Sequence, residues 1–201
     1  MMITLTGFMG SGKTTVGKVL ADFLGCPFMD LDDLVVKKAG KSIPDIFAQD
    51  GEPAFRLLEA QVLRKTVEKY AESTAVLALG GGAVLAPASA ALLREKTVCI
   101  YLRATLDTLL ARLEGETASR PLLQEIPDQV GDDGGSVVMP GPGSSVMPGP
   151  DSSVMPGPDR ASVSARLASR EPIYEETAHV IIDTDGLSPD EVADEIIISA
   201  L

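Results

Sequence analysis

One glycine-rich stretch has residue types and spacing that could bind phosphate groups. Residues 7–14 have the sequence GFMGSGKT, in which two glycines separated by four residues precede a lysine and a threonine. Backbone N–H groups of glycines can approach phosphate oxygens closely because no Cβ stands in the way. The Lys13 ammonium can reach the β- and γ-phosphates of a nucleotide, and the Thr14 hydroxyl can bind Mg²⁺. The stretch predicts a nucleotide phosphate loop, with an ordinary glycine-rich turn as the alternative.

The flanking residues favour the phosphate loop over the turn. Residues 2–6 form an apolar run typical of a strand, and apolar residues recur at helical spacing from residue 13 to about residue 24. The start of such a helix adds a partial positive charge and unpaired N–H donors. Strand, glycine loop and helix in this order are the context in which the motif binds nucleotides. The residues predicted to hold the nucleotide here are Gly10, Ser11, Gly12, Lys13, Thr14 and Thr15.

Two acids, Asp30 and Asp32, follow a second predicted strand at residues 27–30. At an extended chain end, side chains two residues apart lie on the same side. One carboxylate could support Mg²⁺, directly or through water, while the other accepts a hydrogen bond from a substrate hydroxyl. Acids in a first helical turn also cap the helix, and we prefer that interpretation for Asp33.

Three consecutive glycines, Gly80, Gly81 and Gly82, follow the apolar strand predicted at residues 75–79. They form either a turn or a set of N–H donors that approach a small substrate closely. Ligands of parallel α/β sheets bind at the carboxyl ends of the strands. We therefore expect the triplet, Asp30 and the phosphate loop to face one crevice, which favours the second interpretation.

Three arginines and the single histidine complete the candidate residues. Arg56 and Arg170 are either solvated surface residues, the usual place of a lone arginine, or part of the site. Arg120 precedes residues 121–123 in the segment expected to cover the phosphates, where it can stabilise charge on a transferred phosphoryl group. His179 has no evident partner in the sequence, and we interpret it as structural, so the acid–base role does not fall to histidine.

The composition limits the class of protein. The 201 residues are enough for one domain with a core, and a net charge of −12 argues against general nucleic-acid or anionic-membrane binding. Phosphates must then be held by a concentrated local cationic site. Cys26 and Cys99 lack metal-type spacing and predict reduced core cysteines. With no apolar run of about 20 residues and no room for a leader before the phosphate loop, we expect a cytoplasmic protein. We also expect it to be a monomer.

Strand and helix patterns alternate along the chain, which predicts an α/β fold with a parallel sheet and right-handed crossovers. Strands are expected at residues 2–6, 27–30, 75–79, 97–102 and 178–183. Helices are expected at residues 13–24, 31–39, a short one after Ser42, 52–70, 87–94, 106–113, 161–176 with an interruption near Pro172, and from residue 189 to the end.

Residues 124–160 differ sharply in composition, with an eight-residue repeat rich in proline, glycine and serine from Val138 onward. Such a segment does not bury enough apolar area to offset chain entropy, which predicts a flexible insert at about residues 131–159. The fold should tolerate the insert because loop-closure entropy grows only logarithmically with length. The alternative is that its Pro-Gly-Pro units bind a partner with an aromatic groove.

Taken together, these residues resemble the shikimate kinase family. The matching pieces are GFMGSGKT at 7–14, FMDLD at 28–32, GKSI at 40–43, Ile46-Phe47 with Gly51-Glu52, Phe55-Arg56 with Glu59, LGGGAV at 79–84, RPLL at 120–123, and Arg170 with Pro172 and Tyr174. They cover the chain except for about residues 124–160, where the family has a much shorter lid. Each piece alone is a weak signal, but their joint presence and order are specific.

The resemblance implies a P-loop NTPase fold like that of nucleoside monophosphate kinases, with a five-stranded parallel sheet of order 2-3-1-4-5. It implies a single domain over residues 1–201 whose lid lies at about residues 114–165. It also implies transfer of the ATP γ-phosphoryl group to the 3-hydroxyl of shikimate, with Mg²⁺, in chorismate and aromatic amino-acid biosynthesis.

The resemblance also assigns roles to residues of this sequence. The implied catalytic residues are Lys13, Asp32 and Arg120. The implied shikimate-binding residues are Asp32, Arg56, Gly80, Gly81, Gly82 and Arg170. Thr14 and Asp30 would serve the metal ion, Arg112 would flank the adenine, and Arg120 would come from the lid.

Two other functions stay open at this point. The first is another kinase of the same fold, such as a gluconate kinase, against which the glycine triplet, the acid pair and Arg56 with Arg170 argue together. The second is a nucleotide-binding regulator without transfer activity. The presence of Lys13, Asp32 and Arg120 argues against lost chemistry.

Overall fold

Five parallel strands form the centre of the fold. The computed structural model describes residues 1–119 and 159–200. The strands are β1 Met2–Thr6, β2 Phe28–Asp30, β3 Ala75–Ala78, β4 Val98–Arg103 and β5 Val180–Asp183. They lie in the order β2-β3-β1-β4-β5, and every pairing is parallel. The predicted α/β fold and the predicted strand order are confirmed.

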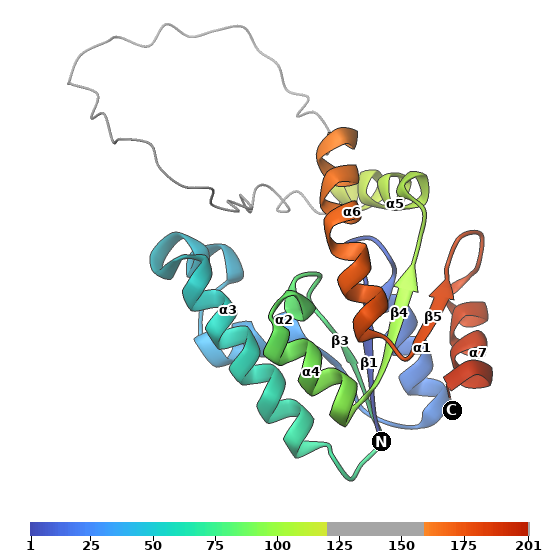
Figure 1. Ribbon diagram of the computed structural model, residues 1–201, viewed down its shortest axis with the longest axis horizontal. Helices are drawn as coiled ribbons and strands as arrows, with labels where there is room; N and C mark the ends of the chain where they lie inside the picture. Colours follow the sequence, from blue (N-terminus) through green and yellow to red (C-terminus); the bar gives the residue numbers. More distant parts are fainter. Residues whose placement is uncertain (120–158, 201) are drawn as a thin grey trace, which may run out of the picture.

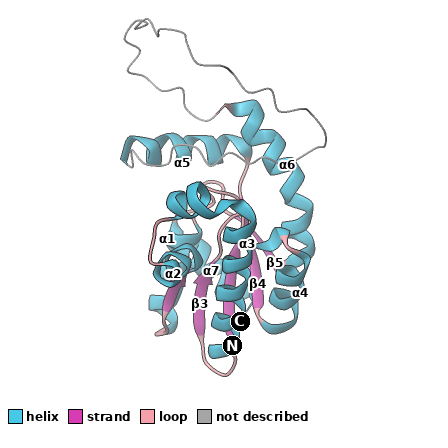
Figure 2. Ribbon diagram, turned by 90° about the vertical axis from the view of Figure 1, so that its left-hand side faces the viewer, coloured by secondary structure: helices cyan, strands magenta, loops and turns pink. Residues whose placement is uncertain are grey.

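Helices cover both faces of this sheet. In the described residues they are α1 Lys13–Leu24, α2 Leu31–Ala39, α3 Ile43–Lys69, α4 Pro87–Lys96, α5 Leu106–Ser119, α6 Arg160–Thr177 and α7 Pro189–Ala200, with a short 3-10 helix, η1, at Ala83–Leu85. Figure 1 shows α3, α4 and α6 on one face and α1 and α7 on the other. In Figure 2, α5 runs across the top of the molecule, above the carboxyl ends of the strands.

The central strand β1 is buried on both faces. Ile3 and Leu5 lie in one buried cluster, which includes residues of α1 and α7. Met2 lies in a second cluster, with residues of α3, α4 and α6. Burial on both faces explains why this strand is nearly continuous in apolar residues. This packing fixes the carboxyl end of β1, where the phosphate loop begins.

Side-chain caps start two helices where the sequence predicts them. At the start of α3, the N–H of Asp45 donates to Ser42 Oγ at 3.3 Å. At the start of α7, the N–H of Glu191 donates to Ser188 Oγ at 3.3 Å, and the N–H of Ser188 donates to Glu191 Oε2 at 2.8 Å. Each cap satisfies N–H groups that a helix start leaves without partners.

One helix prediction is confirmed and two need correction. The predicted break between the short helix after Ser42 and the helix from about residue 52 lies at Gly51 (φ 80°, ψ 168°), a non-helical residue at a kink within α3. α5 continues to Ser119, beyond the predicted end. α6 continues through Pro172, where the sequence predicts an interruption. Proline removes one helical hydrogen bond, but Val163 and Tyr174 are buried on either side of it and hold the helix against the core.

Some predictions fall outside this description. Arg120 and the predicted insert at about residues 131–159 lie almost entirely beyond the described residues. Within the two described ranges, none of the helices has the length and apolar character that crossing a bilayer requires.

Candidate active site

The carboxyl edge of the sheet brings three predicted segments together: the phosphate loop after β1, the end of β2, and the glycine triplet (residues 80–82) after β3. A Cβ added at Gly81 would lie 3.7 Å from the carbonyl oxygen of Gly7. A Cβ added at Gly80 would lie 2.8 Å from Oδ1 of Asp32. The three segments therefore meet at one place, below α5 and the upper part of α6 (Figure 1).

The phosphate loop has the close contacts that its sequence predicts. Gly7 has φ 143°, and a Cβ there would lie 2.6 Å from the carbonyl oxygen of Leu102, so the position requires glycine. Lys13 Nζ donates to the carbonyl oxygens of Gly7 at 2.9 Å and Phe8 at 2.7 Å. The ammonium therefore lies against the loop, where this motif holds β- and γ-phosphates.

Thr14 and Asp30 supply oxygen atoms next to the loop. Thr14 Oγ1 donates to Asp30 Oδ2 at 2.9 Å, and Asp30 Oδ1 accepts from the N–H of Asp32 at 3.0 Å. Mg²⁺ prefers such oxygen ligands and usually keeps waters and phosphate oxygens as well. The described part of the chain has no cluster of three or more histidine, cysteine, aspartate or glutamate residues suited to a metal. The pair therefore offers oxygen ligands of the kind that Mg²⁺ prefers.

Asp32 is a partly buried carboxylate between cations and another acid. Burial raises its pKa most, and the negative charge of Asp30 raises the pKa further. The positive charges of Lys13 and Arg56 act in the opposite direction. A carboxylate with a raised pKa in such a setting is suited to accept a proton from a substrate hydroxyl.

Arg56 is held by two glutamates of its own helix. Its Nε donates to Glu52 Oε1 at 3.2 Å, and its Nη1 donates to Glu59 Oε2 at 3.0 Å. Glu59 is buried, and burial raises its pKa, while the charge of Arg56 opposes that shift. A Cβ added at Gly82 would lie 2.5 Å from Nη1 of Arg56. The glycine therefore lets the guanidinium lie directly against the backbone of the triplet.

Arg170 and Tyr174 lie one turn apart on α6 and reach the same place from the other side. The guanidinium carbon of Arg170 lies 6.0 Å from the centre of the Phe8 ring, in the phosphate loop. Tyr174 is fully buried, and its hydroxyl donates to the carbonyl oxygen of Gly81 at 2.5 Å. Burial raises the pKa of that hydroxyl, whereas the charge of Arg170, its hydrogen bond to the hydroxyl, and the charge of Arg56 lower it. Both guanidinium groups therefore lie near Tyr174.

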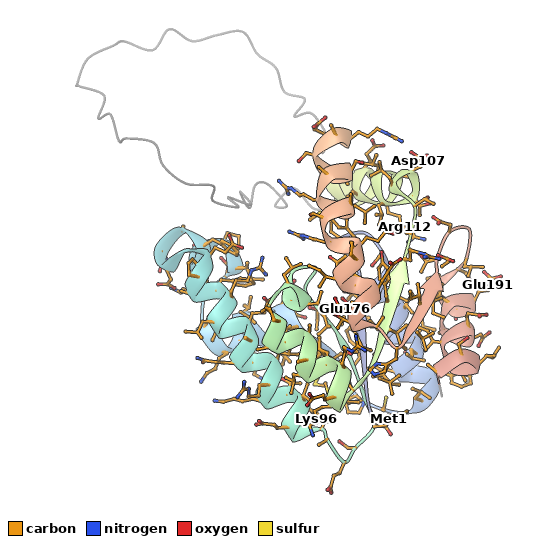
Figure 3. The ribbon with its side chains drawn as sticks, viewed as in Figure 1. Met1, Lys96, Asp107, Arg112, Glu176 and Glu191 are labelled. Atoms are coloured by element: carbon orange, nitrogen blue, oxygen red, sulfur yellow. The ribbon has the colours of Figure 1, made fainter. Side chains whose placement is uncertain are left out.

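Arg112 joins the phosphate loop to the loop after β5 (Figure 3). Its Nη2 donates to the carbonyl oxygen of Thr184 at 2.9 Å, and its Nη1 donates to Thr184 Oγ1 at 3.2 Å and to the carbonyl oxygen of Gly10 at 3.4 Å. Since β5 and β3 lie on opposite sides of β1, Arg112 lies on the β5 side of the loop and the glycine triplet on the β3 side.

Comparison with known proteins gives the family. The family profile described as Shikimate kinase matches residues 9–133. The shikimate kinase of Salinibacter ruber is 41% identical over 185 residues, which is 92% of this chain and 78% of that protein. The shikimate kinase of Enterococcus faecalis is 36% identical over 196 residues, which is 97% of this chain and 95% of that protein. The chain belongs to the shikimate kinase family.

Solved structures agree with this family assignment. Shikimate kinase from Acinetobacter baumannii in complex with shikimate has a TM-score of 0.73 and 30% identity, and the match covers 98% of this chain and 90% of that one. Shikimate kinase from Bacteroides thetaiotaomicron has the same TM-score at 26% identity, over 97% and 95% of the two chains. A gluconokinase from Sinorhizobium meliloti, at 16% identity and a TM-score of 0.50, shares the fold alone.

The predicted site residues of this family member are gathered at one edge wherever the structure describes them. Beyond the contacts above, Ser11 is buried and its Oγ lies 3.4 Å from Lys13 Nζ. Thr15 is exposed in the first turn of α1. Arg120 lies outside the described residues, so its predicted role in the lid stays a prediction.

Three neighbours of the site belong to the pieces that resemble the family but receive no site role from the sequence: Glu52, Glu59 and Tyr174. The two glutamates lie four residues before and three residues after Arg56, and this helical spacing is the signal that predicts ion pairs on one face. The contact of Tyr174 with Gly81 joins residues 93 apart in sequence. No spacing rule could have found it.

The structural interpretation of His179 is confirmed. Its Nδ1 accepts from the N–H of Cys99 at 3.0 Å, and its Nε2 lies 3.0 Å from the carbonyl oxygen of Arg94. With Nδ1 as the acceptor, Nε2 carries the proton and donates. These contacts lie near the amino ends of β4 and β5, at the edge of the sheet opposite Lys13.

Proposed function

We propose that the chain transfers the γ-phosphoryl group of ATP to the 3-hydroxyl of shikimate, giving ADP and shikimate 3-phosphate in chorismate and aromatic amino-acid biosynthesis. One juxtaposition carries the proposal: Asp32 lies against Gly80 and Arg56 against Gly82, while Tyr174, one turn from Arg170 on α6, donates to Gly81. Membership of the shikimate kinase family supports the same activity.

The chemistry of shikimate suits this arrangement. It offers a carboxylate, which we assign to Arg56 and Arg170 because guanidinium groups bind carboxylates through paired hydrogen bonds. It also offers ring hydroxyls, which we assign to Asp32 and to the N–H groups of the glycine triplet. Cations and hydrogen-bond donors around one acid make a site for a hydroxylated carboxylate in a protein of net charge −12.

The reaction follows from these assignments. Asp32 accepts the proton of the 3-hydroxyl while the hydroxyl oxygen bonds to the γ-phosphorus and the bond to the β,γ-bridging oxygen breaks. Lys13 and the loop N–H groups hold and neutralise the phosphates. Thr14 and Asp30 would hold Mg²⁺, directly or through water, and the ion would neutralise further phosphate charge. Most of the catalysis is then positioning and charge neutralisation.

The remaining assignments are proposals of the same kind. Gly10, Ser11, Gly12 and Thr15 would bind phosphate, and Arg112 would flank the adenine. Arg120 would reach the phosphates from a lid at about residues 114–165 of a single domain that spans residues 1–201. A monomeric state and a cytoplasmic location stay predictions from the sequence.

The test is ADP release from MgATP, measured by a coupled assay with shikimate, with gluconate and with no acceptor. We expect ADP release with shikimate only. A Lys13→Ala variant, prepared in the same way, controls for contaminating kinases and should release at most about a hundredth of the ADP, because the loop loses its charge on the phosphates.

Two results would contradict the proposal. Turnover with gluconate and none with shikimate would make the chain a gluconate kinase. ATP binding without turnover on either acceptor would make it a nucleotide-binding regulator.

A further inference from the structure

The glycine triplet carries three backbone N–H groups that have no acceptor among the described residues. Within residues 1–119 and 159–200, none of the N–H groups of Gly80, Gly81 and Gly82 has a hydrogen-bond acceptor. A buried N–H without a partner is rare in native proteins. Gly82 is buried. A ligand in the site can therefore accept from these N–H groups only if the peptide groups of the triplet are held with their N–H bonds toward the site.

The Tyr174 hydroxyl fixes that orientation. It donates to the carbonyl oxygen of Gly81 at 2.5 Å, from a fully buried side chain on α6. The described residues contain no cis peptide bond. In a trans peptide the carbonyl and the next N–H point in opposite directions. Anchoring the Gly81 oxygen on the α6 side therefore aims the N–H of Gly82 away from α6.

Arg170 lies beside the same hydroxyl. It is one helical turn before Tyr174 on α6, and its guanidinium lowers the pKa of the hydroxyl. The hydroxyl donates its one proton to Gly81, so it can meet the guanidinium only as an acceptor. Packing holds the tyrosine ring in place, since its centre lies 5.2 Å from the centre of the Tyr101 ring on β4. One phenol therefore links the guanidinium of α6 to the backbone after β3.

We infer that Tyr174 is a positioning residue for the acceptor substrate: it holds Arg170 and the N–H groups of the glycine triplet in a fixed relation, so that the carboxylate and the hydroxyls of one hydroxy acid are bound as a unit. The inference rests on the proposed function and adds a residue to it. The contact of the Tyr174 hydroxyl is with the backbone of Gly81, and we assign it no part in holding the phosphates or in the transfer step. Its loss should therefore affect the acceptor and leave ATP binding unchanged.

Tyr174→Phe tests the inference, and Tyr101→Phe is the matched control. Both variants remove one hydroxyl from the same pair of buried rings, but only the first removes the bond to Gly81. We expect Tyr174→Phe to lower kcat/KM for shikimate by at least about tenfold, because loose positioning of reacting groups is costly in rate. The KM for ATP should stay within about twofold in both variants, and Tyr101→Phe should keep its kcat/KM for shikimate.

A double-mutant cycle distinguishes positioning from a purely structural role, because only positioning couples the effects of the two substitutions on kcat/KM for shikimate. If Arg170 acts through Tyr174, the losses from Arg170→Lys and Tyr174→Phe should be clearly less than additive in kcat/KM for shikimate. Additive losses, an equal rise in the KM for ATP, or equal effects of the two Phe variants would overturn the inference.

The design separates failure of the inference from failure of the proposed function. An unmutated chain that releases no ADP with shikimate removes the function itself. An active unmutated chain with an unaffected Tyr174→Phe variant removes only the inference. If Tyr174→Phe unfolds, the unmutated chain with 3-fluorotyrosine at its three tyrosines gives the same test. The shikimate KM must then change and the ATP KM must not.

Discussion

The surroundings of Asp32 disfavour the ionised form of its carboxyl group. Burial and the neighbouring Asp30 raise the pKa of Asp32, and Lys13 and Arg56 only partly offset that rise. A carboxyl group with a raised pKa in the folded state binds protons more tightly there than in the unfolded chain. As pH rises from the unfolded pKa to the folded pKa, the unfolded chain ionises first, and the free energy of unfolding falls. The ionised acid therefore destabilises the fold at neutral pH.

Replacing Asp32 by Asn should separate activity from stability. Turnover with shikimate should fall by about 10² to 10⁴-fold, because the acceptor of the hydroxyl proton is lost. The free energy of unfolding of the variant, relative to the unmutated chain, should increase as pH rises from about 4 to about 7, because asparagine does not titrate. Urea unfolding at several pH values measures this difference, and the ADP assay measures turnover.

Asp33→Asn is the matched control for Asp32→Asn. Asp33 is exposed and lies in the same first turn of α2, so the variant changes the same charge near the same helix start. It should keep its turnover. Full turnover in Asp32→Asn would remove the assigned role of Asp32.

The sequence predicts most of the candidate site residues, but almost none of the contacts that hold their side chains in position. The resemblance of the sequence to a family identifies Arg56 as a site residue. The position of its guanidinium group, however, depends on the buried Glu59 and on the missing side chain at Gly82. Sequence spacing predicts that residues 56 and 59 share a helix face. It does not predict that Glu59 is buried or that residue 82 lies against the guanidinium, because both depend on packing between α3 and the loop after β3.

At the scale of the elements, β1 contains two buried hydroxyls on one face. Thr4 Oγ1 lies 2.9 Å from Thr97 Oγ1, and Thr97 Oγ1 donates to the carbonyl oxygen of Leu93 at 2.7 Å. Thr4 is therefore the donor in its pair. Thr6 Oγ1 is also buried, and among the described residues it is the one buried side-chain nitrogen or oxygen without a hydrogen-bond partner. Two buried threonine hydroxyls on the same strand thus differ in whether they have a hydrogen-bond partner.

Val substitutions should separate these two threonines. Thr4→Val removes a buried hydrogen bond and should lower the free energy of unfolding by about 1 kcal/mol. Thr6→Val removes a buried hydroxyl without a partner and should leave the free energy of unfolding unchanged or raise it by about 1 kcal/mol. Urea unfolding of both variants under one condition gives the comparison. A loss for Thr6→Val as large as that for Thr4→Val would mean that the Thr6 hydroxyl has a stabilising contact.

Local sequence predicts where a helix begins better than it predicts whether a helix continues through a proline. The helices after Ser42 and Ser188 begin where they are predicted, and the caps at these two serines need only residues three positions apart. The continuation of α6 through Pro172 depends on distant contacts of Val163 and Tyr174 with the core. A local proline rule predicts an interruption because these contacts are absent from the local sequence.

At the scale of the whole molecule, alternating strands and helices predict a parallel sheet but not its order. Several orders satisfy the rule of right-handed crossovers, and the order 2-3-1-4-5 comes from the family resemblance. The observed order places β1 between β3 and β4, so the phosphate loop lies between the triplet after β3 and Arg112 after β4. Strand order thus decides which residues share the site.

The net charge of −12 also acts on the molecule as a whole. Like charges repel one another more strongly in the compact state than in the expanded chain. Raising KCl from about 0.01 M to about 0.15 M shortens the screening length from roughly 30 Å to 8 Å. We therefore expect the free energy of unfolding in urea, which is uncharged, to rise by on the order of 1 kcal/mol at pH 7.

A variant with fewer negative charges distinguishes this repulsion from other effects of salt. Four exposed acids, none in an ion pair with a described residue, suit the purpose: Glu68→Gln, Glu72→Gln, Glu95→Gln and Asp194→Asn. The combined variant should be more stable than the unmutated chain at low salt and should respond less to KCl, because fewer like charges remain to be screened. If salt lowered the stability of the unmutated chain, its ion pairs would outweigh its net charge, and repulsion across the whole molecule would not control its stability.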